Sequence, residues 1–86
     1  MFLEIVTPDE KVFEGEVESA TFPGSDGSFQ VLSDHAAMIS TLGDGDIKFT
    51  REVNKKPEET HIAVSGGVVE VLNNKVTVLA EKIIKE

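Results

Sequence analysis

Ser33, Asp34 and His35 stand side by side and supply the three residue types of a hydrolase triad. In a triad, however, the three side chains converge from separate parts of the chain, whereas adjacent residues of an extended segment point to opposite faces. No nucleophile-elbow pattern accompanies them in the sequence. This arrangement therefore favours a polar loop with a local Asp turn over a small hydrolase.

The remaining candidates for metal or phosphate chemistry are incomplete sets. His35 and His61 are too few for a zinc site, and no ligand spacing supports one. Asp44 and Asp46 share a strand phase, as at the start of a calcium loop, but the residues that follow lack further oxygen ligands. Gly24–Gly27 could cradle a phosphate, yet neither a Lys nor a helix follows. We therefore expect a chain that is not an enzyme, with no catalytic residue, no metal site and no cofactor.

The composition describes a small acidic chain. Sixteen acidic and eight basic residues among 86 give a formal net charge of −8. Such a charge repels nucleic acid and anionic lipid headgroups; it favours a basic partner surface or serves solubility alone. No apolar run approaches the ~20 residues of a membrane span, and no signal-peptide pattern leads the chain. We expect one domain over residues 1–86 that stays in the compartment where it is made.

Apolar and polar residues alternate with a period of two along most of the chain, and no long window keeps a helical period. Turn-forming residues separate the alternating runs, which predicts an all-β fold, an antiparallel β-sandwich of roughly 8–10 short strands. We expect tight hairpin turns at Asp44-Gly45, Gly66-Gly67 and Asn73-Asn74, and exposed loops over Pro23–Gly27 and Asn54–Pro57.

Two local features interrupt this alternation. Val17 sits on one strand phase whereas Ala20 and Phe22 sit on the other, which predicts a β-bulge near Glu18-Ser19. Lys82–Glu86 could begin a helix, but it is far shorter than the ~12 residues that an isolated helix needs. No helix longer than about two turns is expected.

The segment Ala36–Leu42 is apolar on both strand phases, although a sandwich strand needs only one apolar phase. One interpretation is a central strand covered by loops. The other is a strand whose outer face docks a partner, with the adaptable Met38 side chain in the contact.

Two stretches carry a family resemblance. LEIVTPDEKVFEGEVESATFPGSDGSF, residues 3–29, and VSGGVVEVLNNKVTVLAE, residues 64–81, resemble the opening and the close of one β-sandwich family. That family is the N-terminal domain of the epsilon subunit of the F-type ATP synthase. Asp34-His35-Ala36 stands where the family carries a Gly-His-Ala loop. Ser33-Asp34 replaces the family's Pro-Gly, and Ala37 replaces a Pro.

This resemblance implies a non-catalytic rotor subunit in the central stalk of a proton- or sodium-driven F-type ATP synthase. Such a subunit links the gamma subunit to the membrane c-ring and lies peripherally on the cytoplasmic face of the bacterial inner membrane. In the family a C-terminal two-helix hairpin restrains ATP hydrolysis or binds ATP, and those activities are not carried over to this chain. The alternative from another class is a free-standing β-sandwich ligand-binding module, which would need a pocket with aromatic and convergent polar groups.

The resemblance also implies two partner-binding surfaces. For the gamma-like contact we expect one strand phase to face outward, formed by His35, Ala36, Met38, Ser40 and Leu42. For the contact with the c-ring we expect a loop from Ser25 to Asp34 that presents Asp26, Gly27, Ser28, Phe29, Gln30, Leu32 and Asp34.

Overall fold

The computed structural model describes residues 1–84, which form one sheet of seven strands. The strands are β1 (Phe2–Val6), β2 (Lys11–Glu16), β3 (Ser19–Gly24), β4 (Gly27–Leu32), β5 (Met38–Val53), β6 (Lys56–Leu72) and β7 (Lys75–Ile83). Their order in the sheet is β2-β1-β7-β6-β5-β3-β4. No helix occurs within residues 1–84, so the all-β prediction is confirmed, and none of these residues belongs to a helix that could cross a membrane.

The predicted number of strands is wrong because β5 and β6 are much longer than ordinary strands. They contain 16 and 17 residues and pair along their whole length, from Met38 opposite Val71 to Val53 opposite Lys56. Neighbouring strands are antiparallel with one exception, since β1 and β7 run parallel.

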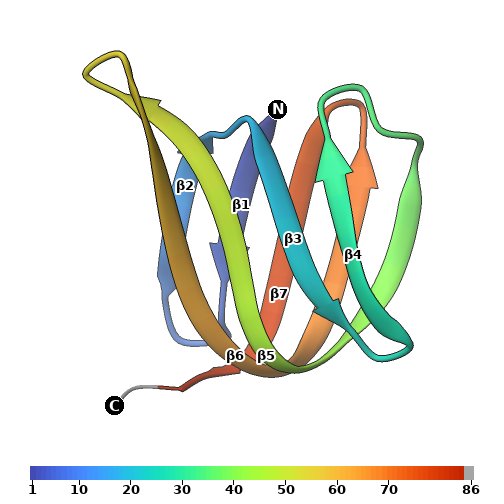
Figure 1. The fold of residues 1–86 in the computed structure, drawn as a ribbon. Helices are drawn as coiled ribbons and strands as arrows, with labels where there is room; N and C mark the ends of the chain where they lie inside the picture. The colour runs from blue at the N-terminus through green and yellow to red at the C-terminus, as the bar shows by residue number, and fades with distance from the viewer. Residues whose placement is uncertain (85–86) are drawn as a thin grey trace.

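The long strands fold the sheet over on itself, as Figure 1 shows where β5 and β6 curve together. The C-terminal part of β6 pairs with β7, whereas the C-terminal part of β5 pairs with β3. One layer therefore contains β2, β1, β7, the end of β6 and the start of β5. The other layer contains the start of β6, the end of β5, β3 and β4.

Two of the residue pairs predicted as hairpin turns, Asp44-Gly45 and Gly66-Gly67, lie at this bend instead, so both of those predictions are wrong. Asp44-Gly45 is inside β5 and Gly66-Gly67 is inside β6. Gly67 has φ 140°, and a Cβ at that position would overlap the carbonyl oxygen of Leu79. Gly45 has φ 154°, and its Cβ would lie 2.8 Å from the Cβ of Pro23. Glycine is required at both positions because the neighbouring strand approaches closely where β5 and β6 bend.

The tight turns lie elsewhere in the chain. Asn73 and Asn74, with φ 50° and 61°, join β6 to β7, which confirms the third predicted hairpin. Asn54 and Lys55, with φ 53° and 62°, join β5 to β6, so the exposed loop expected over Asn54–Pro57 is only this two-residue turn. A similar turn at Ser25-Asp26 joins β3 to β4, which leaves Pro23, Gly24 and Gly27 in strands.

The predicted bulge near Glu18-Ser19 is wrong, because the chain crosses between layers at this point. β2 is the first strand in the sheet order, whereas β3 is the last but one. The crossing is held by a hydrogen bond from the Val17 N–H to the Met1 carbonyl at 2.9 Å and one from the Glu18 N–H to the Thr50 carbonyl at 2.8 Å. At the other end of the chain, β7 continues through Ile83, so no helix begins at Lys82, where the sequence would have allowed a short one. The last two residues of Lys82–Glu86 lie outside the described residues.

The core lies between the two layers and is filled mainly by aliphatic side chains. Phe22 and Phe49 are its largest fully buried members, and the Phe49 ring lies 4.4 Å from the partly buried ring of Phe13. The buried apolar set is Met1, Leu3, Ile5, Val17, Ala20, Phe22, Val31, Leu42, Ile47, Phe49, Val64, Val69, Val71, Val76, Val78 and Ala80.

Candidate functional site: two protein-binding surfaces

The strand phase predicted to face a partner points into the core. Leu42 is a core residue with 5% exposure, and Met38 is partly buried and packs against the core. Ser40 shares this phase because it pairs with the buried Val69, and Met38 pairs with the buried Val71. The outward orientation expected for Met38, Ser40 and Leu42 is therefore wrong. His35 and Ala36 precede β5 and lie in the loop that leads into it.

The opposite phase of β5 belongs to an exposed apolar surface. Ile39 is 71% exposed, and Leu72, Leu79 and Val68 are 50%, 49% and 40% exposed. Val68 pairs directly with Leu79, and Ile39 pairs with Glu70 between Val68 and Leu72, so these side chains share one face of the layer. We call Ile39, Val68, Leu72 and Leu79 the outer apolar face.

A shallow hollow of about 370 Å³ adjoins this face where β5 begins and β6 ends. Its lining is mostly apolar and is formed by Ala37, Met38, Ile39, Glu70, Val71 and Leu72. The sequence signal for this surface is the excess of apolar residues on both phases, which recurs in Val68-Val69 and in Val78-Leu79. Sequence reasoning pointed to Ala36–Leu42 but expected the wrong phase to face outward, and it did not include the exposed apolar residues of β6 and β7.

The surface predicted to contact the c-ring is a strand rather than a loop. Gly27 to Leu32 form β4, which lies at the edge of the sheet and pairs with β3. Asp26 lies in the turn before β4 and Asp34 lies in the loop after it, so the two carboxylates are separated by a strand roughly 20 Å long. Along β4, Gly27, Ser28 and Gln30 are exposed, and Leu32 is 53% exposed. Phe29 is partly buried, with its ring 5.5 Å from that of Phe22.

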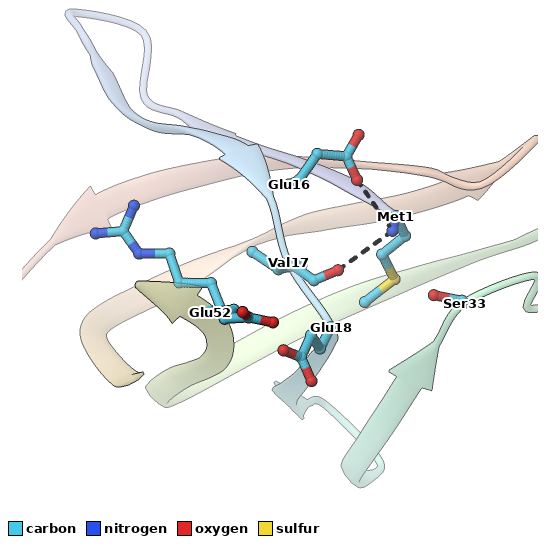
Figure 2. A pocket seen from close by; sticks show the side chains of 7 residues that line it. Met1, Glu16, Val17, Glu18, Ser33 and Glu52 are labelled. Carbon is cyan, nitrogen blue, oxygen red and sulfur yellow. Dashed lines mark hydrogen bonds and ion pairs between the residues drawn. The ribbon is translucent and has the colours of Figure 1, made fainter. Parts of the chain in front are cut away.

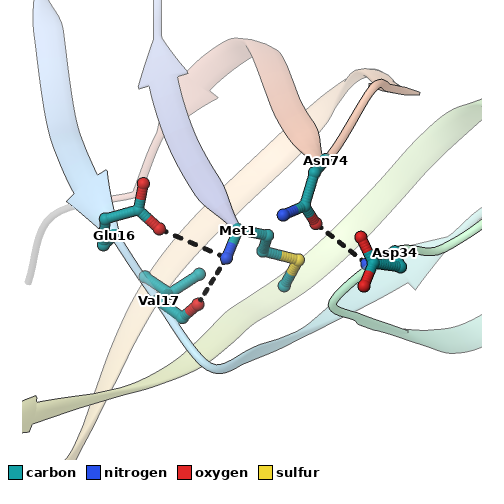
Figure 3. A network of polar contacts seen from close by, with 5 residues as sticks. All are labelled: Met1, Glu16, Val17, Asp34 and Asn74. Carbon is teal, nitrogen blue, oxygen red and sulfur yellow. Dashed lines mark hydrogen bonds and ion pairs between the residues drawn. The ribbon is translucent and has the colours of Figure 1, made fainter.

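The loop after β4 is held by hydrogen bonds from the backbone N–H groups of Asp34 and His35. The Asp34 N–H donates to Oδ1 of Asn74 at 2.9 Å (Figure 3). The His35 N–H donates to the Leu32 carbonyl at 3.2 Å, and Nδ1 of His35 lies 2.8 Å from the Ala36 carbonyl oxygen, to which it donates when protonated. These contacts form the polar loop that the sequence favours, closed by a local turn at Asp34 with φ 62°.

A polar hollow of about 600 Å³ lies beside the N-terminal end of β1, shown in Figure 2. Glu16, Glu18 and Glu52 contribute carboxylates to its lining, together with Met1, Val17, Ser33 and Arg51. The amino group of Met1 forms an ion pair with Glu16 at 3.2 Å and donates to the Val17 carbonyl at 3.2 Å. Nε of Arg51 is buried without a hydrogen-bond partner, and its guanidinium lies 5.3 Å from the centre of the Phe13 ring.

Asp44, Asp46 and His61, which suggested metal chemistry, contact protein groups instead. Asp44 accepts a hydrogen bond from the Ser65 hydroxyl at 2.7 Å. Asp46 lies 3.6 Å from Nδ1 of His61, whose Nε2 lies 2.8 Å from Glu59. Across residues 1–84, no group of three or more His, Asp or Glu side chains is arranged to hold a metal ion.

Solved structures share this fold. The chain superimposes with a TM-score of 0.82 on a chain of the Euglena gracilis mitochondrial ATP synthase, covering 95% of this chain and 51% of that one at 21% identity. A chain of the Tetrahymena thermophila mitochondrial ATP synthase, in a structure of the central stalk and c-ring, matches with a TM-score of 0.74 at 21% identity, covering 98% of this chain and 65% of that one.

Sequence comparisons identify the family. Residues 1–86 match the family described as "ATP synthase, Delta/Epsilon chain, beta-sandwich domain". The ATP synthase epsilon chain of Maridesulfovibrio salexigens is 48% identical over 82 residues, which cover 94% of this chain and 54% of that protein. The epsilon chain of Salinibacter ruber is 42% identical over 86 residues, covering 94% of this chain and 58% of that protein. The chain thus spans little more than half the length of these relatives. By its sequence and its fold it belongs to the family of ATP synthase delta/epsilon chain β-sandwich domains.

Proposed function

We propose that residues 1–86 act as one β-sandwich domain of a non-catalytic central-stalk subunit, which links the gamma subunit to the c-ring of an F-type ATP synthase. In this role the domain supports the coupling of proton or sodium translocation to ATP synthesis. Family membership supports the proposal. The matching chains also support it, because one belongs to a structure of the Tetrahymena thermophila central stalk and c-ring and the other to a Euglena gracilis structure that includes F1 and the c-ring. The bacterial relatives favour a peripheral position on the cytoplasmic face of the inner membrane.

The observation that carries this proposal is the outer apolar face. Four large apolar side chains from three neighbouring strands are 40% to 71% exposed on one surface of a small acidic protein. Burial of each such side chain is favourable by roughly 1.5–3 kcal/mol when it is complete. A surface of this kind is typical of a protein–protein contact.

We assign the gamma contact to this outer apolar face and to the hollow beside it. Met38 lines the hollow, and His35 and Ala36 lie in the loop just before β5. These three residues therefore remain in the proposed contact. Leu42 and Ser40 lie on the opposite, core-facing phase of the same strand and so are assigned no direct contact with gamma.

We assign the c-ring contact to β4 and the turns that flank it. Asp26 and Asp34 lie at its two ends. The exposed residues between them are Gly27, Ser28, Gln30 and Leu32. With Phe29 supporting the strand from the core side, this surface suits a partner that is polar and basic. A sheet is a stiff element, and stiffness is what a coupling contact needs.

The gamma assignment is tested by capture of a purified gamma subunit on the immobilised protein. Ile39→Asp and Leu79→Asp each place a charge in the proposed dry contact, so we expect each to lower the affinity by several kcal/mol. Lys48→Asp is the matched control, because Lys48 is an exposed residue of β5 on the outer face of the other layer. Equal capture of gamma by all three variants would contradict this assignment, and no capture by the unchanged protein would contradict the function.

A further inference from the structure

The sheet has two edge strands, and the first of them, β2, is protected by charge. Lys11 of β2 forms ion pairs with Glu14 at 2.8 Å and with Glu4 of the neighbouring strand at 3.5 Å. Glu16, at the end of β2, pairs with the Met1 amino group at 3.2 Å. Charged side chains along an edge discourage another strand from pairing there.

The second edge strand, β4, has none of these protections. Its sequence from Gly27 to Leu32 contains no charged residue and no proline. Within residues 1–84 it pairs with β3, without a register shift, and with no other strand. An uncharged, regular edge of this kind is a template for a further strand.

The register identifies which residues of β4 present their backbone outward. Gly24 and Gly27 face each other across the two-residue turn Ser25-Asp26, so they form the hydrogen-bonded pair that closes this hairpin. Hydrogen-bonded and non-bonded pairs alternate along an antiparallel ladder. The N–H and C=O groups of Ser28, Gln30 and Leu32 therefore point away from β3. The Leu32 carbonyl already accepts a hydrogen bond from the His35 N–H, so the other five groups are the ones oriented towards a further strand.

The charges at the ends of β4 decide what can pair with this edge. Asp26 and Asp34 are each four residues from Gln30. If two copies paired antiparallel about Gln30, the turn that carries Asp26 in each copy would lie at the same end of the paired strands as the loop that carries Asp34 in the other. Two like-charged contacts would oppose this pairing, as would the net charge of −8 on each copy. A segment with a basic residue at each end would form two attractive contacts instead.

We propose that β4 is a docking edge for an extended segment of a partner protein that carries Lys or Arg at both ends, and that Asp26 and Asp34 prevent two copies from pairing. The segment would add a strand of about five residues to the sheet. This proposal adds detail to the c-ring contact assigned to β4. It rests on that proposed function only for the identification of the partner as a component of the ATP synthase.

The first test uses the unchanged protein and a fluorescent peptide in which Thr and Val alternate between two terminal Lys residues. We expect binding that weakens with salt, measured by fluorescence anisotropy. Gln30→Pro removes one outward N–H, and an edge strand tolerates proline at such a position, so we expect roughly tenfold weaker binding. Gln30→Ala keeps the N–H and should bind as the unchanged protein does. Equal binding by both variants, or equal binding of a peptide with proline at its centre, would overturn the proposal.

The second test reverses the charge pattern and does not depend on Gln30. Asp26→Lys makes both cross-copy contacts attractive, so we expect this variant to dimerise in analytical ultracentrifugation. The double variant Asp26→Lys/Asp34→Lys restores like charges and should remain monomeric, as should the unchanged protein. A monomeric Asp26→Lys variant, or a dimeric unchanged protein, would overturn the assignment of this edge.

These two tests can fail without contradicting the proposed function, and the proposed function can fail without contradicting them. The peptide and ultracentrifugation measurements use the protein without any membrane. Co-sedimentation with membranes that contain the c-ring tests the proposed function by itself, because loss of ring binding leaves the peptide result unchanged.

Discussion

The backbone N–H of Asp34 donates a hydrogen bond to Oδ1 of Asn74 at 2.9 Å, across 40 residues of sequence. Asn74 also accepts a hydrogen bond through its carbonyl from the Phe2 N–H at 3.0 Å. One turn residue thus holds the start of β1 and the loop that leads from β4 towards β5. This contact connects the two proposed binding surfaces, because that loop lies between β4 and the hollow beside Ile39.

Loss of this contact should release the loop after β4. We expect Asn74→Ala to destabilise the protein by about 1–3 kcal/mol, because a hydrogen bond is lost and Ala is strained at φ 61°. Asn73→Ala is the matched control, since Asn73 has φ 50° and the same strain without the bond to Asp34. Amide hydrogen exchange at Asp34 should accelerate only in Asn74→Ala. Unchanged exchange there would show that the side chain of Asn74 does not hold the loop.

The bend in the long strands should depend on Gly67. A Cβ at this position overlaps the Leu79 carbonyl oxygen, so Gly67→Ala must move β7 away from β6. Gly27→Ala is a suitable control, because Gly27 also has positive φ, 123°, but has nothing within 4 Å of the added Cβ. In urea unfolding we expect about 1–3 kcal/mol of destabilisation from backbone strain for Gly27→Ala and a distinctly larger loss for Gly67→Ala. Equal losses would mean that the bend tolerates a side chain.

The orientation of β5 is testable with two truncations three residues apart. Leu42→Ala removes a core side chain and should cost about 2–5 kcal/mol of stability. Ile39→Ala, at a position 71% exposed, should change stability by no more than about 0.5 kcal/mol. Thermal and urea unfolding of the isolated protein measure both. A larger loss of stability for Ile39→Ala than for Leu42→Ala would contradict this orientation and would mean that Met38, Ser40 and Leu42 face outward.

The ion pair on the protected edge gives a pH-dependent prediction. The Lys11 side chain lowers the pKa of Glu14 from its ordinary value of 4.5 by hydrogen bonding and by its charge, and Glu14 in turn raises the pKa of Lys11. Because the folded pKa of Glu14 is the lower one, its stabilising contribution is present above pH 4.5 and is lost as the pH falls through the folded value. An NMR titration should find the Glu14 midpoint below 4.5, and Lys11→Met should return it towards the ordinary value. A midpoint that does not respond to Lys11→Met would mean that this pair does not persist in solution.

The sequence by itself determined the all-β class, the Asn73-Asn74 turn and the family. Period-two alternation and paired asparagines are local signals, and local signals specify strands and two-residue turns wherever the neighbouring segments agree with them. The same kind of signal misled at Asp44-Gly45 and Gly66-Gly67. A glycine with positive φ serves a tight turn and a bent strand equally, and only the approach of Leu79 and Pro23 in the folded sheet distinguishes the two uses.

Only the tertiary structure decided which side of β5 is buried. Ala36–Leu42 carries apolar residues on both phases, so its own pattern is compatible with either orientation. The register with β6 settles the matter, because Met38 and Ser40 face the buried Val71 and Val69 while Ile39 faces the exposed Glu70. The same holds for the distance between Asp26 and Asp34, which the sequence placed in one loop. Pairing of β4 with β3 makes the intervening residues a strand and separates the two carboxylates to its ends, since backbone hydrogen bonding to a distant segment outweighs local turn chemistry.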